Sequence, residues 1–228
     1  MKSHNEKKPS ELKPIDPKML ARIQSLRLMD DDFMTIVFSG DTKLTEFVLS
    51  IILNRNDLTV KSSMTQQEKH NLFGRSVRLD ILAVDNAGKI YNIEIQRADK
   101  GALERRVRYN QAMIDSHALK RNDDFAALPE VYIIFITEND LYKKGKPIYR
   151  EKKSIEVDGE NDLPFDDGVH TIYVNGAYRG NDEIGKLMHD FNTADASQMY
   201  YNEIAECVRY HKQDTEEVNE ANIEEQNA

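Results

Sequence analysis

Residues 77–97 read Val-Arg-Leu-Asp-Ile-Leu-Ala-Val-Asp-Asn-Ala-Gly-Lys-Ile-Tyr-Asn-Ile-Glu-Ile-Gln-Arg, and this stretch decides the fold. Two apolar runs flank an Asp-Asn-Ala-Gly turn, and Asn and Gly between apolar runs are typical of a β-hairpin. If the loop spans residues 86–88, Gly88 takes the left-handed position, where a missing Cβ costs nothing. Asp85 then pairs with Lys89.

The loop sets the register of three polar side chains on the two strands. Counting back from the turn places Asp80 opposite Glu94, whereas a slip of two residues places it opposite Gln96. In either register these side chains share one face, because strand side chains alternate with a period of two. The opposite face is apolar and is expected to be core; it carries Val77, Leu79, Ile81, Ala83, Tyr91, Ile93 and Ile95.

The acidic face is otherwise apolar, with Leu82 and Ile90 beside the carboxylates. Like charges opposite each other destabilise a sheet, and a buried carboxylate without a partner costs several kcal/mol. The pair therefore needs a proton, an arginine or a divalent cation. One interpretation is a structural pair neutralised by Arg78, Arg97 or Arg106. The other is a Mg²⁺ site, since Mg²⁺ binds few carboxylates and keeps its waters.

The composition is that of a soluble chain that can bury one good core. The sequence has 228 residues, enough for one or two domains, of which 39% are hydrophobic and 31% charged. No apolar run approaches the roughly 20 residues that span a bilayer, and no apolar segment follows the charged start, so neither a membrane span nor a secretory signal is expected. Cys207 is the only cysteine, which excludes an internal disulfide and favours a cytoplasmic protein.

Charge is unevenly distributed along the chain. The formal net charge is −9, which argues against nucleic-acid binding by bulk attraction. Residues 214–228 hold six acidic and no basic residues, however, and residues 97–121 hold seven basic residues against three acidic ones. A basic stripe just downstream of the hairpin can contact phosphate in a chain that is acidic overall.

Apolar periodicity and turn residues predict a mixture of helices and strands. We expect helices at 18–28, 33–38, 42–52 (with Thr42 as N-cap), 100–119, 182–191 and 196–211, strands at 58–67, 131–137 and 169–174 besides the hairpin, and a long loop at 143–167. The helix after the hairpin makes a crossover, which places the strand at 131–137 parallel to a hairpin strand. The fold class is therefore α/β, with a small mixed β-sheet flanked by helices on both faces.

The element order and several motifs resemble the PD-(D/E)XK nuclease superfamily, most closely the PD-(D/E)XK nuclease family transposases, also described as Rpn family recombination-promoting nucleases. The motifs are Asp32-Phe33, Val37-Phe38, Arg78-Leu79-Asp80-Ile81, Asn92-Ile93-Glu94-Ile95-Gln96 and Arg105-Arg106-Val107-Arg108-Tyr109. The resemblance implies a restriction-endonuclease-like core over residues 30–178. Residues 1–29 then form an N-terminal arm and short helix, 179–213 form C-terminal helices, and 214–228 form an acidic disordered tail.

The resemblance also implies roles for the acidic residues. Asp80 and Glu94 would bind Mg²⁺ or Mn²⁺, with the Ile95 carbonyl as a further ligand, and a metal-bound water would attack phosphorus. Glu46, on the helix before the sheet, is a candidate for the extra catalytic acid that some members use. Gln96 stands where many members carry lysine; it can orient a water by hydrogen bonding, as in some active members, but it carries no charge.

Three arginines of the following helix, Arg105, Arg106 and Arg108, are candidates for contacts with the DNA backbone. The alternatives are a solvated helix face or, for Arg106, an ion pair with Glu94. One further departure from the family pattern is Leu79, which replaces the proline of the PD motif and only alters how the chain approaches the site.

The leading hypothesis is a metal-dependent DNA endonuclease associated with mobile elements or recombination. A cut on both strands usually needs two sites, which favours a homodimer. A first alternative is a catalytically silent nuclease-fold protein that binds DNA or a protein partner, which Gln96 and the acidic net charge favour. A second alternative is an interaction domain with no nucleic-acid role.

Overall fold

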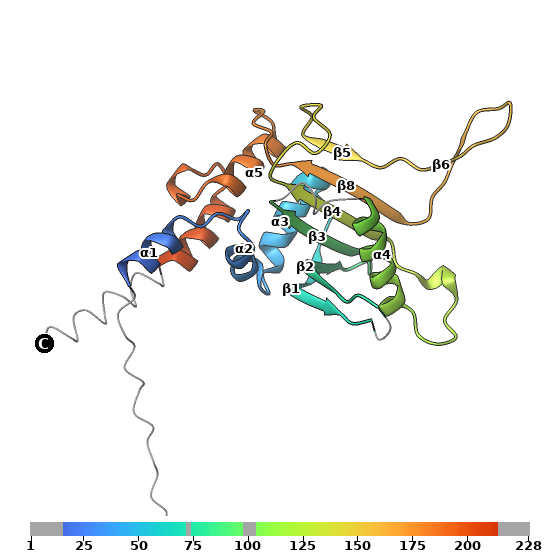
Figure 1. Ribbon diagram of the computed structural model, residues 1–228, viewed down its shortest axis with the longest axis horizontal. Coiled ribbons are helices and arrows are strands. Elements are labelled where there is room, and N and C mark those ends of the chain that lie inside the picture. Colours follow the sequence, from blue (N-terminus) through green and yellow to red (C-terminus); the bar gives the residue numbers. More distant parts are fainter. Residues whose placement is uncertain (1–15, 72–73, 98–103, 214–228) are drawn as a thin grey trace, which may run out of the picture.

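The computed structural model describes residues 16–71, 74–97 and 104–213 (Figure 1). The predicted N-terminal arm up to residue 14, the predicted tail at 214–228 and the first residues of the helix predicted from residue 100 lie outside this described part. Within it, strands and helices follow one another in nearly the order that the sequence predicts.

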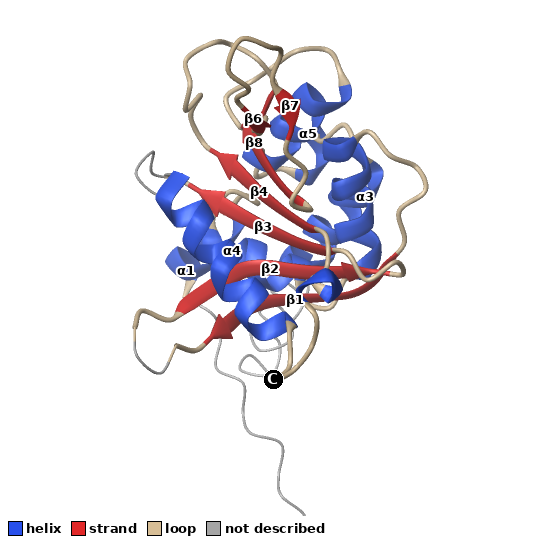
Figure 2. Ribbon diagram, turned by 90° about the vertical axis from the view of Figure 1, so that its right-hand side faces the viewer, coloured by secondary structure: helices blue, strands red, loops and turns tan. Residues whose placement is uncertain are grey.

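Among the described residues, six strands form one mixed sheet through the middle of the molecule (Figure 2). In spatial order they are β1 (Val60–Lys69), β2 (Val77–Asp85), β3 (Ile90–Gln96), β4 (Val131–Thr137), β8 (Val169–Asn175) and β5 (Ile148–Arg150). β3, β4 and β8 run parallel, whereas β1, β2 and β5 pair antiparallel with their neighbours. The predicted parallel crossover to the strand at 131–137 is therefore confirmed.

Helices cover both faces of this sheet, as predicted (Figures 1 and 2). α4 (Glu104–Ala118) lies across one face. The other face is covered by α2 (Asp31–Phe38), α3 (Thr42–Leu53), α5 (Glu183–Asn192) and a helical segment at residues 202–213. α1 (Pro17–Gln24) lies beside that last segment. In the part of the chain that the structure describes, no helix is both long and apolar enough to cross a bilayer.

The hairpin of β2 and β3 has the predicted loop. Gly88 has a φ of +81°, its N–H donates to the Asp85 carbonyl at 3.0 Å, and the Asp85 N–H donates to the Lys89 carbonyl at 3.1 Å. Glycine adopts this backbone conformation without steric cost. The strands follow the predicted register without a slip from Val84 opposite Ile90 to Ile81 opposite Ile93, the last pair before Asp80 and Glu94.

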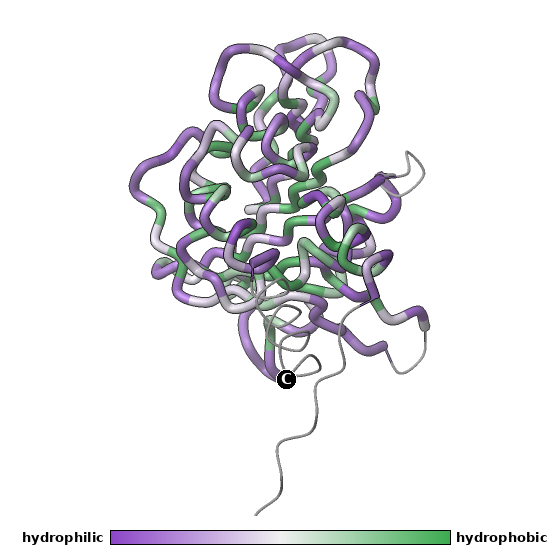
Figure 3. Tube along the Cα trace, turned by 90° about the vertical axis from the view of Figure 1, so that its left-hand side faces the viewer, coloured by the Kyte–Doolittle hydropathy of each residue, from purple (hydrophilic) through white to green (hydrophobic). Residues whose placement is uncertain are grey.

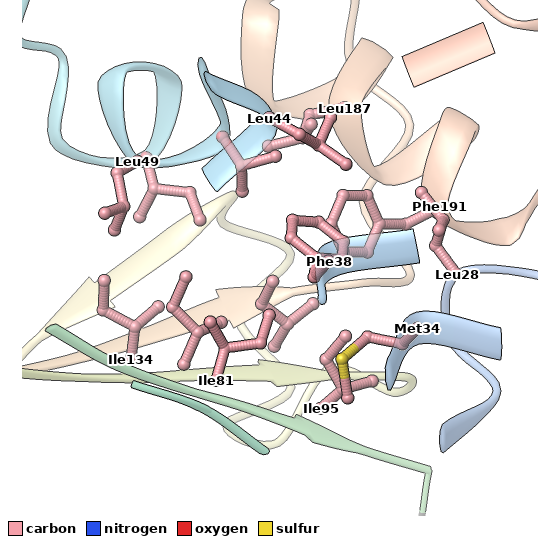
Figure 4. Close-up of a cluster of buried hydrophobic side chains, with 14 of the residues drawn as sticks. Leu28, Met34, Phe38, Leu44, Leu49, Ile81, Ile95, Ile134, Leu187 and Phe191 are labelled. Atoms are coloured by element: carbon pink, nitrogen blue, oxygen red, sulfur yellow. The ribbon is translucent and has the colours of Figure 1, made fainter. Parts of the chain in front are cut away.

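The larger hydrophobic core lies between the sheet and the helices on the side of α3 (Figure 4). Buried side chains of the helices, such as Phe38, Leu49 and Phe191, pack with Ile81 and Ile134 from the strands. Burying one such side chain stabilises the fold by roughly 1.5–3 kcal/mol. Because α5 and residues 202–213 contribute to this cluster, the C-terminal helices share one core with the sheet.

A smaller apolar cluster fills the space between the sheet and α4. It contains Leu79, Leu82, Val107, Ile114, Val131, Ile133, Phe135 and Tyr173. Figure 3 shows the distribution of hydropathy along the chain: hydrophobic segments lie mainly inside the molecule and hydrophilic loops lie at its periphery. The two faces of the sheet are thus unequal, and the face with the smaller cluster also carries the polar side chains of Asn92, Glu94 and Gln96.

The long loop predicted at 143–167 was only partly correct. It contains β5, which pairs with β8 at the edge of the sheet, and the two short strands β6 (Ser154–Ile155) and β7 (Leu163–Pro164). Strands of two or three residues are too short to show the period-two alternation on which a sequence-based assignment depends. β5 forms because its residues pair with the edge of β8, a tertiary contact that local sequence does not reveal.

Two helix starts also differ from the prediction. The N-cap of α3 is Asp41 rather than Thr42, since its side chain accepts a hydrogen bond from the Leu44 N–H at 2.8 Å. The helix predicted at 196–211 instead begins with a 3₁₀ turn, Ala196–Gln198, and becomes α-helical at residue 202. The preceding chain is fixed by buried Asp190, whose carboxylate accepts the N–H groups of residues 200 and 201.

Lys212 holds the C-terminal helical segment against the start of the described chain. Its buried ammonium donates to three backbone carbonyls, those of Gln24 and Leu26 at 2.8 Å and that of Ala194 at 2.6 Å. It also lies 5.2 Å from the centre of the Phe33 ring, within the range of a cation–π contact. One side chain thereby joins three segments that are far apart in sequence.

We expect Lys212→Met to lower the free energy of unfolding by about 2 kcal/mol, because three buried carbonyl groups lose their donor. Urea denaturation followed by circular dichroism measures the change. The matched control is Lys43→Met on the exposed side of α3, which we expect to change stability by less than about 0.5 kcal/mol. Equal stability of the two variants would contradict a structural role for the Lys212 ammonium.

Candidate active site

Asp80 lies at a fork between β2 and β3. The paired register of the two strands ends with Ile81 opposite Ile93. Beyond that pair, Oδ2 of Asp80 accepts a hydrogen bond from the backbone N–H of Ile95 at 2.9 Å. The carboxylate thus takes a donor that a regular ladder would give to a backbone carbonyl, and it is held near the end of β3.

The strand β2 changes face at Asp80. Leu79 packs with Leu82 in the cluster beneath α4, while Ile81 lies in the larger core on the other side. The prediction that Leu79 shares the face of Ile81 was therefore wrong. On β1, Gln66 lies between the residues that pair with Ile81 and Leu79 and has a φ of +53°. Alternation with period two requires extended backbone, and this stretch of the two strands departs from it.

Glu94 is completely buried on the face of β3 that α4 covers. Its Oε2 accepts a hydrogen bond from Nη2 of Arg106 at 2.7 Å, and its Oε1 accepts one from Nδ2 of Asn92 at 2.9 Å. Asn92 is itself buried two residues earlier on the same face. The carboxylate is therefore fixed from two sides, by the helix and by its own strand.

Arg106 links the two polar side chains at the end of β3. Its Nη1 donates to Oε1 of Gln96 at 2.9 Å while its Nη2 contacts Glu94, and its guanidinium lies 5.9 Å from the centre of the Phe135 ring. This confirms that Glu94 and Gln96 share one face. Of the alternatives for Arg106, the ion pair with Glu94 is the one that the structure contains.

The two carboxyl groups have raised pKa values. Burial raises the pKa of Glu94 above its ordinary value, and the neighbouring negative charge of Asp80 raises it further. Burial likewise raises the pKa of Asp80, with an additional contribution from the charge of Asp31. One arginine does not offset two buried acids, so the site favours an added proton or an added cation.

Asp31 brings a third carboxylate towards this region from the first turn of α2. It accepts a hydrogen bond from Nε2 of Gln66 at 3.0 Å and forms an ion pair with Arg78 at 3.7 Å. The sequence motif quoted for the family contains the neighbouring Asp32 and not Asp31. Hairpin spacing cannot reveal Asp31, because its approach depends on how α2 packs against β1 and β2.

The structure does not bring Glu46 to the acidic pair. Glu46 lies on α3, on the side of the sheet opposite α4, and its Oε2 accepts a hydrogen bond from the Val60 N–H at 2.8 Å. Val60 pairs with Asp85, at the opposite end of β2 from Asp80. In this position Glu46 satisfies the first N–H of β1, and its predicted catalytic role gains no support from the geometry.

Arg105 and Arg108 lie on the exposed side of α4, away from Glu94. Both line an open cleft of about 600 Å³ between α4 and the β8–β5 edge of the sheet. Neither forms an ion pair with any residue that the structure describes. The three candidate arginines therefore separate into one that contacts the acidic pair and two that face a neighbouring cleft.

The donors around Asp80 and Glu94 fit a hard divalent cation. Carboxylate and amide oxygens are ligands that Mg²⁺ accepts, and Oδ1 of buried Asn92 has no hydrogen-bond partner. Within the described residues, no three His, Cys, Asp or Glu side chains gather into a metal site. A cation would therefore depend on two carboxylates together with water or backbone oxygen, and the Ile95 carbonyl stays a predicted ligand.

Asn92 belongs to the motif Asn92-Ile93-Glu94-Ile95-Gln96, and its role at the site was not predicted from the sequence. It shares the period-two face of Glu94, so the alternation that placed Glu94 and Gln96 together could also have placed Asn92 beside them. A buried amide next to a buried carboxylate is the expected way to satisfy both groups.

Comparison with known protein families gives one match. A family model described as PD-(D/E)XK nuclease family transposase matches residues 40–176, which contain β1 to β4, α4 and β8. Asp80, Glu94 and Gln96 all lie within the matched region. No curated protein and no solved structure matches the chain significantly.

In the presence of a chelator, we expect the free energy of unfolding to fall as the pH rises above about 4.5, which is the ordinary pKa of a glutamic acid side chain. An acid with a raised pKa binds its proton more tightly when folded, so losing that proton costs stability. Glu94→Gln replaces the acid with a neutral amide, so this loss of stability disappears and the metal-free protein should be more stable at neutral pH. Urea titrations across the pH range measure both effects.

The matched control is Glu156→Gln, which changes an exposed acid between β6 and β7 and should keep the wild-type pH dependence. Destabilisation by Glu94→Gln at neutral pH would mean that the Arg106 ion pair outweighs the repulsion between the two acids.

Proposed function

The chain belongs to the PD-(D/E)XK nuclease family transposases, and from this membership we propose that it is a metal-dependent DNA endonuclease associated with mobile elements or recombination. The observation that carries the proposal is the pair of adjacent buried acids, Asp80 and Glu94, at the fork of β2 and β3. Two buried acids with raised pKa values are costly to a purely structural site and useful to a catalytic one.

Asp80 and Glu94 would hold the cation, Mg²⁺ or Mn²⁺, with the Ile95 carbonyl as a further ligand. When bound, such an ion stabilises negative charge on the phosphate and lowers the pKa of a water molecule. The Ile95 N–H orients the carboxylate of Asp80, and the Asn92 amide orients that of Glu94. Both orienting contacts come from β3, so the two acids keep their spacing as long as the hairpin register holds.

Gln96 and Arg106 complete the polar face. The side-chain amide of Gln96 can hold a water in place by hydrogen bonding, and Arg106 neutralises one of the two acids while no cation is bound. The Arg106 side chain is 38% exposed, so its guanidinium already contacts solvent and can turn from Glu94 to a phosphate at the surface. Its planar guanidinium suits both carboxylate and phosphate.

Two features of the whole protein belong to the same proposal. A cut on both DNA strands needs two such sites, which favours a homodimer. The free thiol of Cys207 packs against the core, and burial raises its pKa to about 11, which keeps it protonated and unreactive. An unreactive single cysteine agrees with a cytoplasmic location.

The alternative is a catalytically silent member that binds DNA or a protein partner. Gln96 in place of the usual lysine favours it, as does the net charge of −9. The two functions differ in their need for Asp80. An endonuclease needs it for DNA cleavage, whereas a silent protein cleaves no DNA and needs it at most for folding.

We expect purified protein to nick supercoiled plasmid with Mg²⁺ or Mn²⁺, and Asp80→Asn to lower the rate by about 100-fold or more, the scale of losing one group that stabilises the transition state. Glu46→Gln is the matched control and should retain cleavage, because Glu46 lies on the other side of the sheet. Gel analysis with and without a chelator measures both. Cleavage by Asp80→Asn at the wild-type rate would identify a contaminant, and no cleavage with either metal would favour the silent alternative.

Calorimetric titration with Mn²⁺ tests the same acids without relying on activity. Wild-type protein should bind the ion and Asp80→Ala should not. Arg106→Gln should bind it about fivefold more tightly, because Glu94 no longer has a competing cation. Unchanged Mn²⁺ binding by Asp80→Ala would show that the ion binds elsewhere.

A further inference from the structure

A row of side chains connects the acidic site to the cleft on the other side of α4. Glu94 on β3 is paired in register with Phe135 on β4, Phe135 with Tyr173 on β8, and Tyr173 with Tyr149 on β5. Neighbouring strands lie about 4.8 Å apart, so three strand spacings separate Glu94 from Tyr149 by roughly 14 Å. Phe135 and Tyr173 are buried beneath α4, so a bound DNA strand would reach the cleft across α4 and not along this row. At a rise of about 3.4 Å per nucleotide, the separation of roughly 14 Å corresponds to about four nucleotides.

The far end of the row forms the wall of the cleft that Arg105 and Arg108 line. Its volume is about 600 Å³, and its aromatic wall consists of Tyr142, Tyr149 and Tyr173. A cleft of this size admits a nucleotide or two rather than a duplex. It opens on the same face of the sheet as Glu94, because Phe135 and Tyr173 belong to the cluster beneath α4.

The tyrosines are held in a fixed arrangement. Tyr142 packs edge-on against Tyr149, with ring centres 5.0 Å apart, and against Tyr173 at 5.4 Å. The hydroxyl of Tyr149 donates to Oδ1 of Asp140 at 2.7 Å, which fixes the base of the group. Tyr173 is buried, whereas Tyr142 is 37% exposed. Tyr142 therefore presents a supported aromatic ring to the solvent in the cleft.

Of the basic side chains that line the cleft, two are available to bind a ligand. Lys153 forms an ion pair with Asp167 at 2.9 Å, and Arg150 donates to the Ile52 carbonyl at 3.2 Å, away from the cleft. Glu104 and Glu151 also line the cleft, and their negative charges oppose nonspecific binding of anions. Arg105 and Arg108 remain, both exposed on α4 and both without an ion pair among the described residues. They suit phosphate groups at one edge of an aromatic pocket.

We propose that this cleft binds an unpaired nucleotide of the DNA strand next to the cut, with its base stacked on Tyr142 and its flanking phosphates against Arg105 and Arg108. This rests on the proposed nuclease function and gives its substrate class: DNA with an unpaired segment beside the cleavage position. A base in a duplex is already stacked between its neighbours, so an aromatic ring inside a cleft can reach only a base that is unpaired.

Binding is measured by fluorescence anisotropy with a chelator present, which separates the cleft from cleavage. The probes are a single-stranded oligonucleotide, a perfect duplex of the same sequence and a duplex with a single-stranded overhang. Tyr142→Ala should weaken binding of the single strand and the overhang about tenfold, within the range for losing one stacked base. Tyr142→Phe should bind like wild type, because it keeps the ring.

The matched control is Tyr210→Ala, which removes an exposed tyrosine from residues 202–213, on the other side of the sheet. It should leave binding unchanged. The double variant Arg105→Gln/Arg108→Gln should weaken binding and also lower its dependence on salt, as loss of phosphate contacts does. A 2-aminopurine in the probe should lose fluorescence on binding to wild type and not on binding to Tyr142→Ala.

Three results would overturn the inference: equal binding of the single strand by Tyr142→Ala and wild type, tighter binding of the perfect duplex than of the single strand, or unchanged 2-aminopurine fluorescence on binding. Failure of the nuclease function gives a different pattern. In that case the Tyr142 effects on binding remain, and plasmid cleavage is absent with either metal.

Discussion

The ion pair between Arg106 and buried Glu94 is the interaction on which the polar face of the sheet depends. Glu94 has no contact with solvent, and a buried charge without a partner costs several kcal/mol. The partner comes from α4, so the position of that helix over β3 is set by electrostatics as well as by the small apolar cluster beneath it. Removing Arg106 would leave the buried charge of Glu94 without this cationic partner, whereas Arg106 is 38% exposed and would keep contact with water if Glu94 were replaced.

The two acids are neutralised unequally. Glu94 has an arginine and an amide as partners, whereas the contact that the structure gives Asp80 is one backbone N–H from Ile95. A neutral N–H offsets less of the cost of a buried charge than a guanidinium does. The pair is therefore stable as a whole only with a proton or a further cation, and this imbalance separates it from a structural salt bridge. The proposed metal site at the fork of β2 and β3 rests on this imbalance.

What could be predicted from the sequence was local. The hairpin depends on Gly88 and its neighbours, so its register up to the pair Ile81–Ile93 followed from the turn. The contribution of Asp31 and the position of Glu46 depend on which side of the sheet α2 and α3 pack against, and hairpin spacing carries no information on that. β5 was missed for a related reason, since three residues acquire strand structure only by pairing with β8. The face change at Asp80 is a departure from the period-two rule, which a rule-based prediction cannot anticipate.

The structure also bears on the absence of lysine at position 96. A lysine there would add one positive charge beside the acids, and glutamine adds none. The guanidinium of Arg106 lies 2.9 Å from Oε1 of Gln96 and 2.7 Å from Oε2 of Glu94, so one positive charge is present at this end of β3 although it comes from α4. Arginine stays charged at all relevant pH values and can hydrogen-bond two oxygens at once, which a lysine ammonium does with less geometric control. In the proposed site, Arg106 would therefore supply from α4 the positive charge that a lysine at position 96 would supply from β3. The missing lysine therefore argues less strongly for the silent alternative than the sequence alone suggests.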